Sequence, residues 1–248
     1  MYRLIKKTMI LGHRGWSKNY PENTILAFRK ALELGISGLE FDVQLTADRI
    51  PVIIHDSTLD RTTNGHGAVS MATLEQVHQL NAANLWPQYN MQSVPTLNEV
   101  LDLSVDSIES IFYNIEVKVY EDDWEILIDQ LVHHISSYSG ANDLLISSFH
   151  HPCLQYLKER MPSSKVGLLF EGSSNEAWKT ALEIGADSVN MNYRLITEAL
   201  VYSCHTEGII VCAWTVDEFE DIQKLASWGV DIIISNRPNV ALQAVQSL

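Results

Sequence analysis

The chain has 248 residues, of which 46% are hydrophobic, and it carries a formal net charge of −14. A chain of this length suits one α/β barrel of about 250 residues, and its apolar fraction is enough for one large core. An acidic surface offers no basic face to a phosphate backbone, so we expect no nucleic-acid partner. An anionic substrate would therefore need local positive charge or a metal ion.

The N-terminal stretch and the cysteines bear on the compartment. MYRLIKKTMIL has too few apolar residues for a secretory signal, and no later run is long enough to span a bilayer. Cys153, Cys204 and Cys212 form no CxxC pair, and their odd number argues against a disulfide framework. We therefore expect a cytoplasmic protein without a membrane span, and the oligomeric state stays open.

Short β-branched runs alternate with segments of helical period along the chain. The expected strands are Met9–Gly12, Gly38–Val43, Val52–His55, Ile111–Lys118, Leu144–Ser148, Val166–Phe170, Ser188–Met191, Ile209–Trp214 and Asp231–Ser235. A first helix is expected between a cap at Asn23 or Thr24 and a stop at Gly35, and a short helix behind the capping box of Thr96 and Glu99. Further helices are expected at Trp124–Tyr138, Glu176–Ile184, Glu198–Glu207 and Glu218–Trp228.

This alternation indicates a parallel sheet with helices outside, and about eight units favour a TIM-type (β/α)8 barrel over an open sheet. The expected strands outnumber the eight places by one, so either one of these strands is wrongly assigned or one lies outside the barrel. Gly38–Val43 and Val52–His55 are the suspect pair, because QLTADRIP between them is shorter than the dozen or so residues of a parallel crossover. We expect a small hairpin at the barrel rim there.

The region from 56 to about 95 departs from the alternation. It is rich in Thr, Asn, Gly and His and has weak periodicity. We interpret it as an insertion after the third strand that covers one end of the barrel, because it is too short and polar to hold a core of its own. Residues 1–248 are thus expected to form a single catalytic barrel domain with this inserted segment.

Polar residues stand where several strands end, and in such a barrel the loops after the strands meet at one face. The first strand leads into His13 and Arg14, and the third ends in His55. Glu40 and Asp42 are two residues apart in one strand, which points both carboxylates to the same face.

Glu116 and Lys118 add a third carboxylate and an ammonium to one side of the next strand. Three carboxylates converging in a barrel mouth repel one another unless a cation or a raised pKa relieves them. An all-oxygen ligand set, without cysteine or paired histidine ligands, favours Mg²⁺ or Ca²⁺ over zinc.

Two histidines beside such a metal suit attack on a phosphodiester, with Arg14 and Lys118 stabilising the phosphate charge. One imidazole would take a proton from the nucleophile and the other would give one to the leaving alkoxide, since a pKa of about 6.5 allows either task. Trp214 and Phe149 follow later strands and are expected to wall the pocket.

Each feature also has a simpler explanation. The two strand ends with histidine are ordinary surface turns in many proteins. The paired acids of the second strand fit the polar face of an edge strand, and Glu116 with Lys118 fits a structural ion pair. The joint pattern favours a site, because all these strands offer polar groups at the same end of the barrel.

The motifs GHRG with PENT, LEFDVQLTADRIPVIIHD, LDRTTNGHG, IEVK, SSF and AWTV occur in this order. Together they resemble the glycerophosphodiester phosphodiesterases, especially the single-domain bacterial cytoplasmic type, over nearly the whole chain. The resemblance implies hydrolysis of a glycerophosphodiester, such as glycerophosphocholine or glycerophosphoethanolamine, to sn-glycerol 3-phosphate and an alcohol with Mg²⁺ or Ca²⁺. It implies Glu40, Asp42 and Glu116 as metal ligands, His13 and His55 as the acid/base pair, Arg14 and Lys118 as phosphate ligands, and Glu22 and Asn23 as residues that order the site.

One departure from that family concerns the turn after the last strand. The family usually has Thr-Asp-x-Pro there, whereas this chain has Ser235-Asn236-Arg237-Pro238. The asparagine keeps a turn-forming side chain and loses a charge, so we expect a changed rim near the alcohol group and no effect on catalysis.

Two other functions stay open. One is a non-catalytic binder of glycerophosphate ligands, against which the intact set of candidate residues argues. The other is a barrel enzyme for another diester, such as a phospholipase D-like lyase or an inositol phospholipid phosphodiesterase. The acidic composition gives little support to a membrane-lipid substrate.

Overall fold

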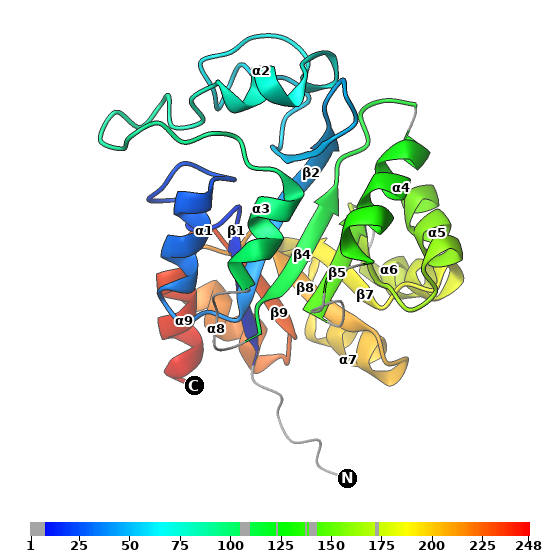
Figure 1. Cartoon of the computed structure of the whole chain (residues 1–248). Helices are drawn as coiled ribbons and strands as arrows, with labels where there is room; N and C mark the ends of the chain where they lie inside the picture. Colours follow the sequence, from blue (N-terminus) through cyan, green and yellow to red (C-terminus); the bar gives the residue numbers. More distant parts are fainter. Residues whose placement is uncertain (1–7, 105–109, 123, 137, 139–142, 172–173) are drawn as a thin grey trace.

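A closed parallel barrel forms the centre of the protein in its computed structural model, which describes residues 8–104, 110–122, 124–136, 138, 143–171 and 174–248 (Figure 1). The barrel strands are β1 (Met9–His13), β2 (Gly38–Leu45), β4 (Phe112–Val117), β5 (Leu144–Ser148), β6 (Lys165–Phe170), β7 (Ser188–Asn192), β8 (Ile210–Trp214) and β9 (Ile232–Ser235). Neighbours in the chain pair in parallel, and β1 closes the ring by pairing with both β9 and β2. The predicted TIM-type barrel is confirmed.

Helices surround this barrel. They are α1 (Ile25–Leu32), α3 (Leu97–Leu101), α4 (Trp124–Ile135), α5 (His151–Arg160), α6 (Ser174–Ile184), α7 (Glu198–Thr206), α8 (Phe219–Ser227) and α9 (Pro238–Gln246), with the short turns η2 (Asp102–Ser104) and η4 (Tyr193–Leu195). The hydroxyl of Thr24 caps α1, and the predicted capping box opens α3. α5 and α9 were not among the expected helices, although each has a proline in its first turn, where the missing N–H would have no helical partner.

The core between the barrel and its helices fixes which side chains point inward. Phe28 of α1, Phe41 of β2 and Tyr113 of β4 are fully buried. The ring centroid of Phe41 lies 5.7 Å from that of Phe28 and 5.9 Å from that of Tyr113. Burying such a side chain contributes about 1.5–3 kcal/mol. Because Phe41 packs toward the helices, the two-residue period of a strand turns Glu40 and Asp42 toward the barrel interior.

The hairpin expected at the rim is present and explains the ninth strand. Among the named strands of the described chain, β3 (Pro51–Ile53) pairs with β2 alone and antiparallel to it, so β2 and β4 are the true neighbours in the barrel. The strand expected at Val52–His55 is therefore not one of the consecutive barrel strands. Since the backbone N–H of Ile54 donates to the carbonyl of Asp42, the returning chain brings His55 back to the level of the acidic side chains.

The segment between β3 and α3 lies above the C-terminal ends of β2 and β4 (Figure 1). It contains the turn η1 (Val69–Met71) and the helix α2 (Leu74–His78). It contributes to a small apolar cluster that it shares with the hairpin, which supplies Val52 and Ile54. The buried members are Val52, Ile54, Leu59, Val69, Val77, Ala82 and Val94.

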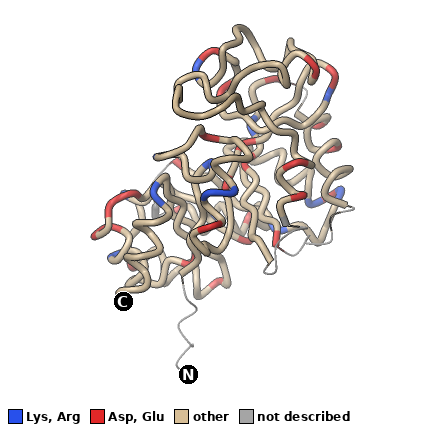
Figure 2. The backbone as a smooth tube through the Cα atoms, turned by 60° about the vertical axis from the view of Figure 1, so that its left-hand side comes forward, with Lys and Arg blue, Asp and Glu red and all other residues tan. Residues whose placement is uncertain are grey.

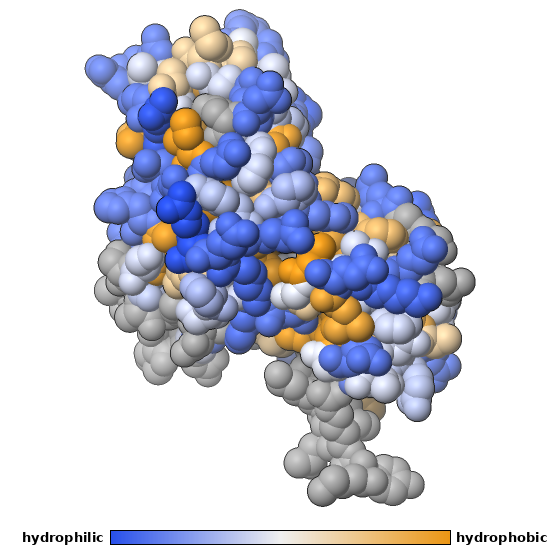
Figure 3. Space-filling view, turned by 90° about the vertical axis from the view of Figure 1, so that its right-hand side faces the viewer, coloured by the Kyte–Doolittle hydropathy of each residue, from blue (hydrophilic) through white to orange (hydrophobic). Residues whose placement is uncertain are grey.

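The surface is polar over most of the faces in view. Acidic residues are spread over both the barrel and the upper segment (Figure 2), and the face in Figure 3 is mainly hydrophilic, with a smaller apolar group near its middle. Cys153, Cys204 and Cys212 are buried and free. Among the described helices, none has the length and apolar character needed to cross a bilayer.

Candidate active site

The loop after β1 turns sharply and places two functional side chains at the barrel mouth. Arg14 and Gly15 both have left-handed backbones, with φ of 53° and 82°. A Cβ on Gly15 would lie 2.6 Å from the carbonyl carbon of Ala27, so only glycine fits there. A non-glycine residue with a left-handed backbone costs on the order of 1–3 kcal/mol. The ion pairs of Arg14 with Glu22 and Asp42 hold it in this conformation. The GHRG motif is thus explained by backbone geometry.

Three carboxylates meet inside the barrel, those of Glu40 and Asp42 buried and that of Glu116 partly buried. Asp42 of β2 pairs in register with Glu116 of β4, and Glu40 lies two residues earlier on the same face as Asp42. Carboxylate oxygens of these three residues lie within 4.8 Å of one another. Glu40 and Asp42 are almost wholly shielded from solvent, with 3% and 0% exposure. The arrangement expected from the sequence is therefore present in space.

The pKa values of the three acids are strongly perturbed. Burial, together with the charges of Asp42 and Glu116, raises the pKa of Glu40 well above its ordinary value. Burial and the charge of Asp42 likewise raise the pKa of Glu116 to about 7. Burial opposes ionisation of Asp42 too, but Lys118 and Arg14 outweigh it and hold the pKa at about 2. A cation among the oxygens would relieve the repulsion that contributes to the raised pKa values of Glu40 and Glu116.

The chemistry of the donors fits a hard divalent cation. All three side chains offer oxygen, which Mg²⁺ and Ca²⁺ prefer. Asn114, which pairs with Glu40 in register, adds a buried amide oxygen that no hydrogen-bond donor in the described part of the chain reaches. These residues could hold a metal ion.

Two cations lie beside the acids. The Nε of Arg14 is 3.2 Å from Asp42 Oδ2, and the Nζ of Lys118 is 3.1 Å from Asp42 Oδ1. Lys118 also donates a hydrogen bond to Glu116. Burial would lower the pKa of Lys118, but Asp42 and Glu116 outweigh it and raise that pKa above its ordinary value. Both cations stay charged near neutral pH.

The imidazole of His13 lies between the acids and the turn after β9. Its Nδ1 is 2.6 Å from Asn236 Oδ1, and its Nε2 is 3.8 Å from Glu40 Oε2. Burial and the charge of Arg14 lower the pKa of His13 to about 4. The ring is therefore neutral at pH 7 and has one N–H and one free lone pair.

The imidazole of His55 contacts Asp56, and hydrogen bonds also hold the backbone around it. Its Nδ1 is 2.6 Å from Asp56 Oδ1, and the hydroxyl of Tyr120 donates to the backbone carbonyl of His55 at 2.7 Å. Gln44 Nε2 donates to the carbonyls on both sides of it, at 2.8 Å each. Burial lowers the pKa of His55, with Asp42 acting in the opposite direction.

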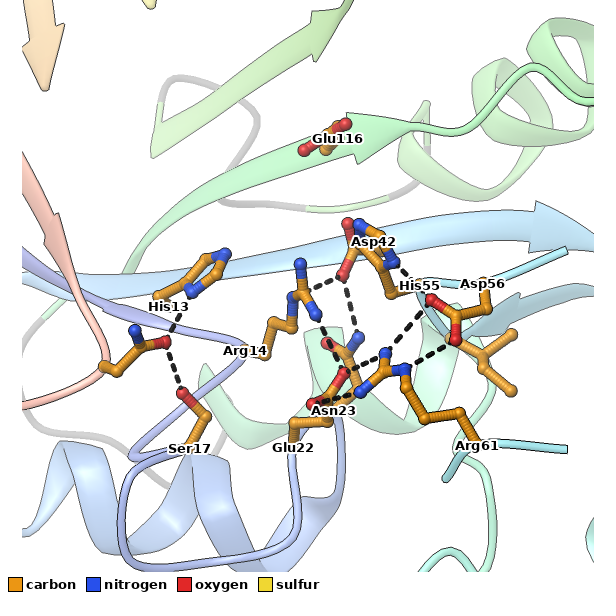
Figure 4. Close-up of polar contacts among 12 residues, drawn as sticks. His13, Arg14, Ser17, Glu22, Asn23, Asp42, His55, Asp56, Arg61 and Glu116 are labelled. Carbon is orange, nitrogen blue, oxygen red and sulfur yellow. Dashed lines mark hydrogen bonds and ion pairs between the residues drawn. The ribbon is translucent and has the colours of Figure 1, made fainter. Parts of the chain in front are cut away.

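A network of ion pairs joins the first loop to the inserted segment (Figure 4). Arg61 Nε contacts Asp56 Oδ2 at 2.5 Å, and Arg61 Nη2 contacts Glu22 Oε1 at 2.8 Å. Glu22 also accepts from Arg14 Nη1 at 2.9 Å. Neither Arg61 nor Asp56 was among the expected site residues, although both lie within the sequence motifs of the family. A long-range contact between such motifs has no signal in sequence spacing.

The amide of Asn23 donates to Asp42 Oδ2 at 2.8 Å (Figure 4). Asn23 has a left-handed backbone with φ of 55°, which asparagine adopts more readily than most residues. The contacts of Glu22 and Asn23 thus support the expectation that both residues order the site.

A cavity of about 220 Å³ opens beside these groups. Phe149 and Trp214 form one wall, with ring centroids 5.9 Å apart and planes at 87°. The exposed Glu171, which the sequence analysis did not single out, also lines it. Among the predicted residues, Glu22, Asn23 and Asp42 lie behind the lining. The predicted residues that line the cavity are His13, Arg14, Glu40, His55, Glu116, Lys118, Phe149 and Trp214.

Comparison with known proteins decides the family. The model of the glycerophosphoryl diester phosphodiesterase family matches residues 13–240. The chain belongs to this family. The glycerophosphodiester phosphodiesterase of Caldanaerobacter subterraneus subsp. tengcongensis is 40% identical over 241 residues, covering 97% of this chain and 98% of that relative.

Solved structures agree with this family assignment. A phosphodiesterase from Oleispira antarctica, solved in complex with the product sn-glycerol-3-phosphate, is 28% identical, has a TM-score of 0.89 and covers 96% of each chain. A structure from Silicibacter pomeroyi at 23% identity shares the fold, with a TM-score of 0.88 over 98% of this chain and 94% of that one. The protein is therefore an enzyme with glycerophosphodiester phosphodiesterase activity, as the motifs predicted.

Proposed function

We propose that the protein is a divalent-metal-dependent hydrolase that converts glycerophosphodiesters to sn-glycerol 3-phosphate and an alcohol by the action of two histidines. The observation that carries this proposal is the meeting of three carboxylates, two histidines and two cations at or beside one cavity. The product bound to the Oleispira antarctica relative supports the same product here.

Glu40, Asp42 and Glu116 would hold the ion, either Mg²⁺ or Ca²⁺. When bound, it would neutralise developing charge on a phosphoryl oxygen and favour attack at phosphorus. The raised pKa values of Glu40 and Glu116 support this assignment, because binding would replace the protons on those acids.

Arg14 and Lys118 would bind the phosphodiester. Both already line the cavity, and both are oriented by Asp42. Glu22 holds the far side of the Arg14 guanidinium. Cations held in place before the reaction stabilise the transition state without reorganising, which is where electrostatic catalysis gains most.

His13 and His55 would move the protons. One imidazole takes the proton of the attacking hydroxyl as the new O–P bond forms. The other gives a proton to the leaving oxygen as the old P–O bond breaks. The attacking hydroxyl is that of water, which gives sn-glycerol 3-phosphate directly, or the neighbouring hydroxyl of the glycerol, which gives a cyclic phosphate that water then opens to the same product.

The leaving alcohol would lie against Phe149 and Trp214. Aromatic faces bind the cationic ends of choline and ethanolamine, and Glu171 adds a negative charge on the same cavity. This combination supports glycerophosphocholine and glycerophosphoethanolamine as substrates.

The chain, residues 1–248, would act as one catalytic domain with its inserted segment at about 56–95. The contact of Arg61 in that segment with Glu22 in the first loop supports this. The buried free cysteines support a reducing compartment, and we propose the cytoplasm.

The test is release of sn-glycerol 3-phosphate from glycerophosphocholine by purified protein, first stripped with chelator and then resupplied with Mg²⁺ or Ca²⁺. Activity that disappears and returns with the ion supports the proposal. Full activity after complete removal of divalent ions would contradict the metal dependence. Binding of glycerophosphocholine by folded, metal-loaded protein without product release would instead indicate a non-catalytic binder.

A further inference from the structure

His13 is held from behind by Asn236, at the position where the sequence departs from the usual family pattern. β1 and β9 are neighbours, with Gly12 opposite Ser235, so the next residue of each strand reaches the same edge of the barrel. There the Nδ1 of His13 lies 2.6 Å from Asn236 Oδ1. The hydroxyl of Ser17 donates to the same oxygen at 2.8 Å (Figure 4).

Asp217 determines which way the Asn236 amide points. One carboxylate oxygen of Asp217 accepts from Asn236 Nδ2 at 2.8 Å, and the other accepts from the Asn236 backbone N–H at 2.8 Å. The Ser235 hydroxyl donates to that second oxygen at 3.1 Å. Rotating the amide by half a turn would set its oxygen against a carboxylate oxygen. The amide nitrogen therefore faces Asp217, and the amide oxygen faces His13.

This orientation decides which nitrogen of His13 carries the proton. An amide oxygen only accepts hydrogen bonds, so the imidazole must present an N–H at Nδ1. In a neutral ring the other nitrogen, Nε2, then has the free lone pair. Nε2 is the nitrogen on the side of the acids, at 3.8 Å from Glu40 Oε2.

We propose that Asn236, oriented by Asp217, is a positioning residue that keeps His13 in the Nδ1–H form, so that Nε2 accepts the proton of the attacking hydroxyl. The inference rests on the proposed function of His13 and replaces the expectation from the sequence that Asn236 has no effect on catalysis. The O–H bond of the nucleophile breaks as the proton moves to Nε2 and the O–P bond forms. The leaving oxygen takes its proton from the other imidazole.

The test combines an exchange of the two side chains with a direct measurement of the tautomer. Asn236→Leu keeps the size of the side chain and removes the acceptor. Asn236→Asp restores an acceptor but sets two carboxylates against each other. The double variant Asn236→Asp/Asp217→Asn swaps the carboxylate and the amide, so an acceptor again faces His13. Nitrogen-15 NMR of labelled histidine in the full-length protein reports which ring nitrogen is protonated.

We expect Asn236→Leu to lower kcat by on the order of 10²-fold with little change in KM, because proton transfer by a positioned group contributes about 10²- to 10⁴-fold. Its His13 resonances should show a mixture of tautomers. The exchanged double variant should recover at least about tenfold of the loss, since it restores the acceptor. If Asn236 had a purely structural role, the loss of kcat in each variant would instead follow its loss of thermal stability, and the His13 tautomer would stay unchanged.

Asn98→Leu is the matched control, because Asn98 Oδ1 contacts His134 Nδ1 at 2.9 Å on exposed helices outside the site. It should leave kcat and the His13 resonances as in wild type. An Asn236→Leu enzyme with kcat within about threefold of wild type, or with only the Nδ1–H form, would overturn the inference. Wild-type protein that shows the Nδ1–H form and hydrolyses no glycerophosphodiester would overturn the proposed function instead. If Asn236→Leu does not fold, kcat of Asn236→Asp is compared with that of the double variant. A higher kcat in the double variant supports the inference, and equal values would overturn it.

Discussion

Asp42 and Glu116 lie opposite each other on the neighbouring strands β2 and β4, yet the pKa values of their carboxyl groups move in opposite directions. Asp42 is buried and Glu116 is partly buried, and burial favours the neutral acid in both. Asp42 stays ionised because it also contacts Arg14, Lys118 and Asn23. Glu116 contacts Lys118 but also faces the charge of Asp42, and its pKa rises to about 7. Of these two acids, Asp42 therefore keeps its negative charge, whereas Glu116 would lose its proton on binding a metal ion.

Removing the Glu116 carboxylate should weaken metal binding. For Glu116→Gln we expect the affinity for Mg²⁺ or Ca²⁺, measured by calorimetry, to fall by at least about tenfold, because one charged ligand is lost. In the wild type, affinity should fall as pH drops below about 7, where Glu116 binds a proton. Equal affinity of variant and wild type would contradict the assignment of this ligand.

The same variant gives a sign-specific prediction for the metal-free protein. The folded pKa of Glu116 is raised, so its ionisation costs stability as pH rises from its unfolded value of about 4.3 through about 7. The free energy of unfolding of metal-free Glu116→Gln, relative to that of metal-free wild type, should therefore increase from pH 5 to pH 8, by at most about 3 kcal/mol. Urea unfolding at both pH values checks this. A gain at pH 5 that disappears at pH 8 would show that the sign is wrong.

Lys118→Met should impair turnover more than folding. The change removes a cation from the cavity and leaves Asp42 with Arg14 as its remaining charged partner, so we expect kcat/KM to fall by about 10²- to 10³-fold. Lys30→Met is the control, because Lys30 pairs with Glu33 on the exposed face of α1. Steady-state kinetics of both variants provide the measurement, and equal losses would show that the cavity charge is not used.

The sequence predicted most of the barrel and of the candidate site because both depend on short-range patterns. Glu40 and Asp42 point inward because of the two-residue period of a strand, and Phe41 between them packs outward. The short loop between β2 and β3 also identified their hairpin, since it is too short for a parallel crossover. These rules act within one strand or one loop and can be followed in the letters.

The parts that the sequence did not predict depend on contacts between distant segments. Asn236 and His13 are 223 positions apart, and only closure of the barrel between β1 and β9 brings them together. Arg61 reaches Glu22 across 39 positions. Without the register of the closed barrel, neither contact follows from composition or spacing.

Arg61→Ala should lower kcat without abolishing it. Arg61 contacts Asp56, the partner of His55, and Glu22, the partner of Arg14, so its loss loosens both functional side chains at once. We expect a reduction of about tenfold, since the pairs are partly exposed and solvent weakens each of them. Arg160→Ala, which removes an exposed partner of Asp129, is the control. Wild-type kcat in Arg61→Ala would argue against any positioning role for the network.

Glu171→Gln should change the choice of substrate. If Glu171 attracts the cationic end of the leaving alcohol, the variant should raise KM for glycerophosphocholine and glycerophosphoethanolamine by about three- to tenfold. KM for the neutral headgroup of glycerophosphoglycerol should stay the same or fall. The comparison of the three substrates on one enzyme preparation is its own control. Equal shifts for all three would show that the carboxylate does not read the headgroup.

The two histidines should differ in how their loss responds to the leaving group. Either His13→Ala or His55→Ala should lower turnover of glycerophosphocholine by about 10²- to 10⁴-fold. A nitrophenolate needs no proton to leave. With a p-nitrophenyl phosphodiester as substrate, the variant that lacks the proton donor should therefore regain most of its turnover, whereas the other variant should stay impaired. Asp56 supports a cationic ring at His55, whereas the neutral amide of Asn236 does not do so at His13. We therefore expect His55→Ala to be the restored variant. Full turnover of glycerophosphocholine by both variants would rule out the histidine mechanism, and restoration of His13→Ala instead would reverse the two roles.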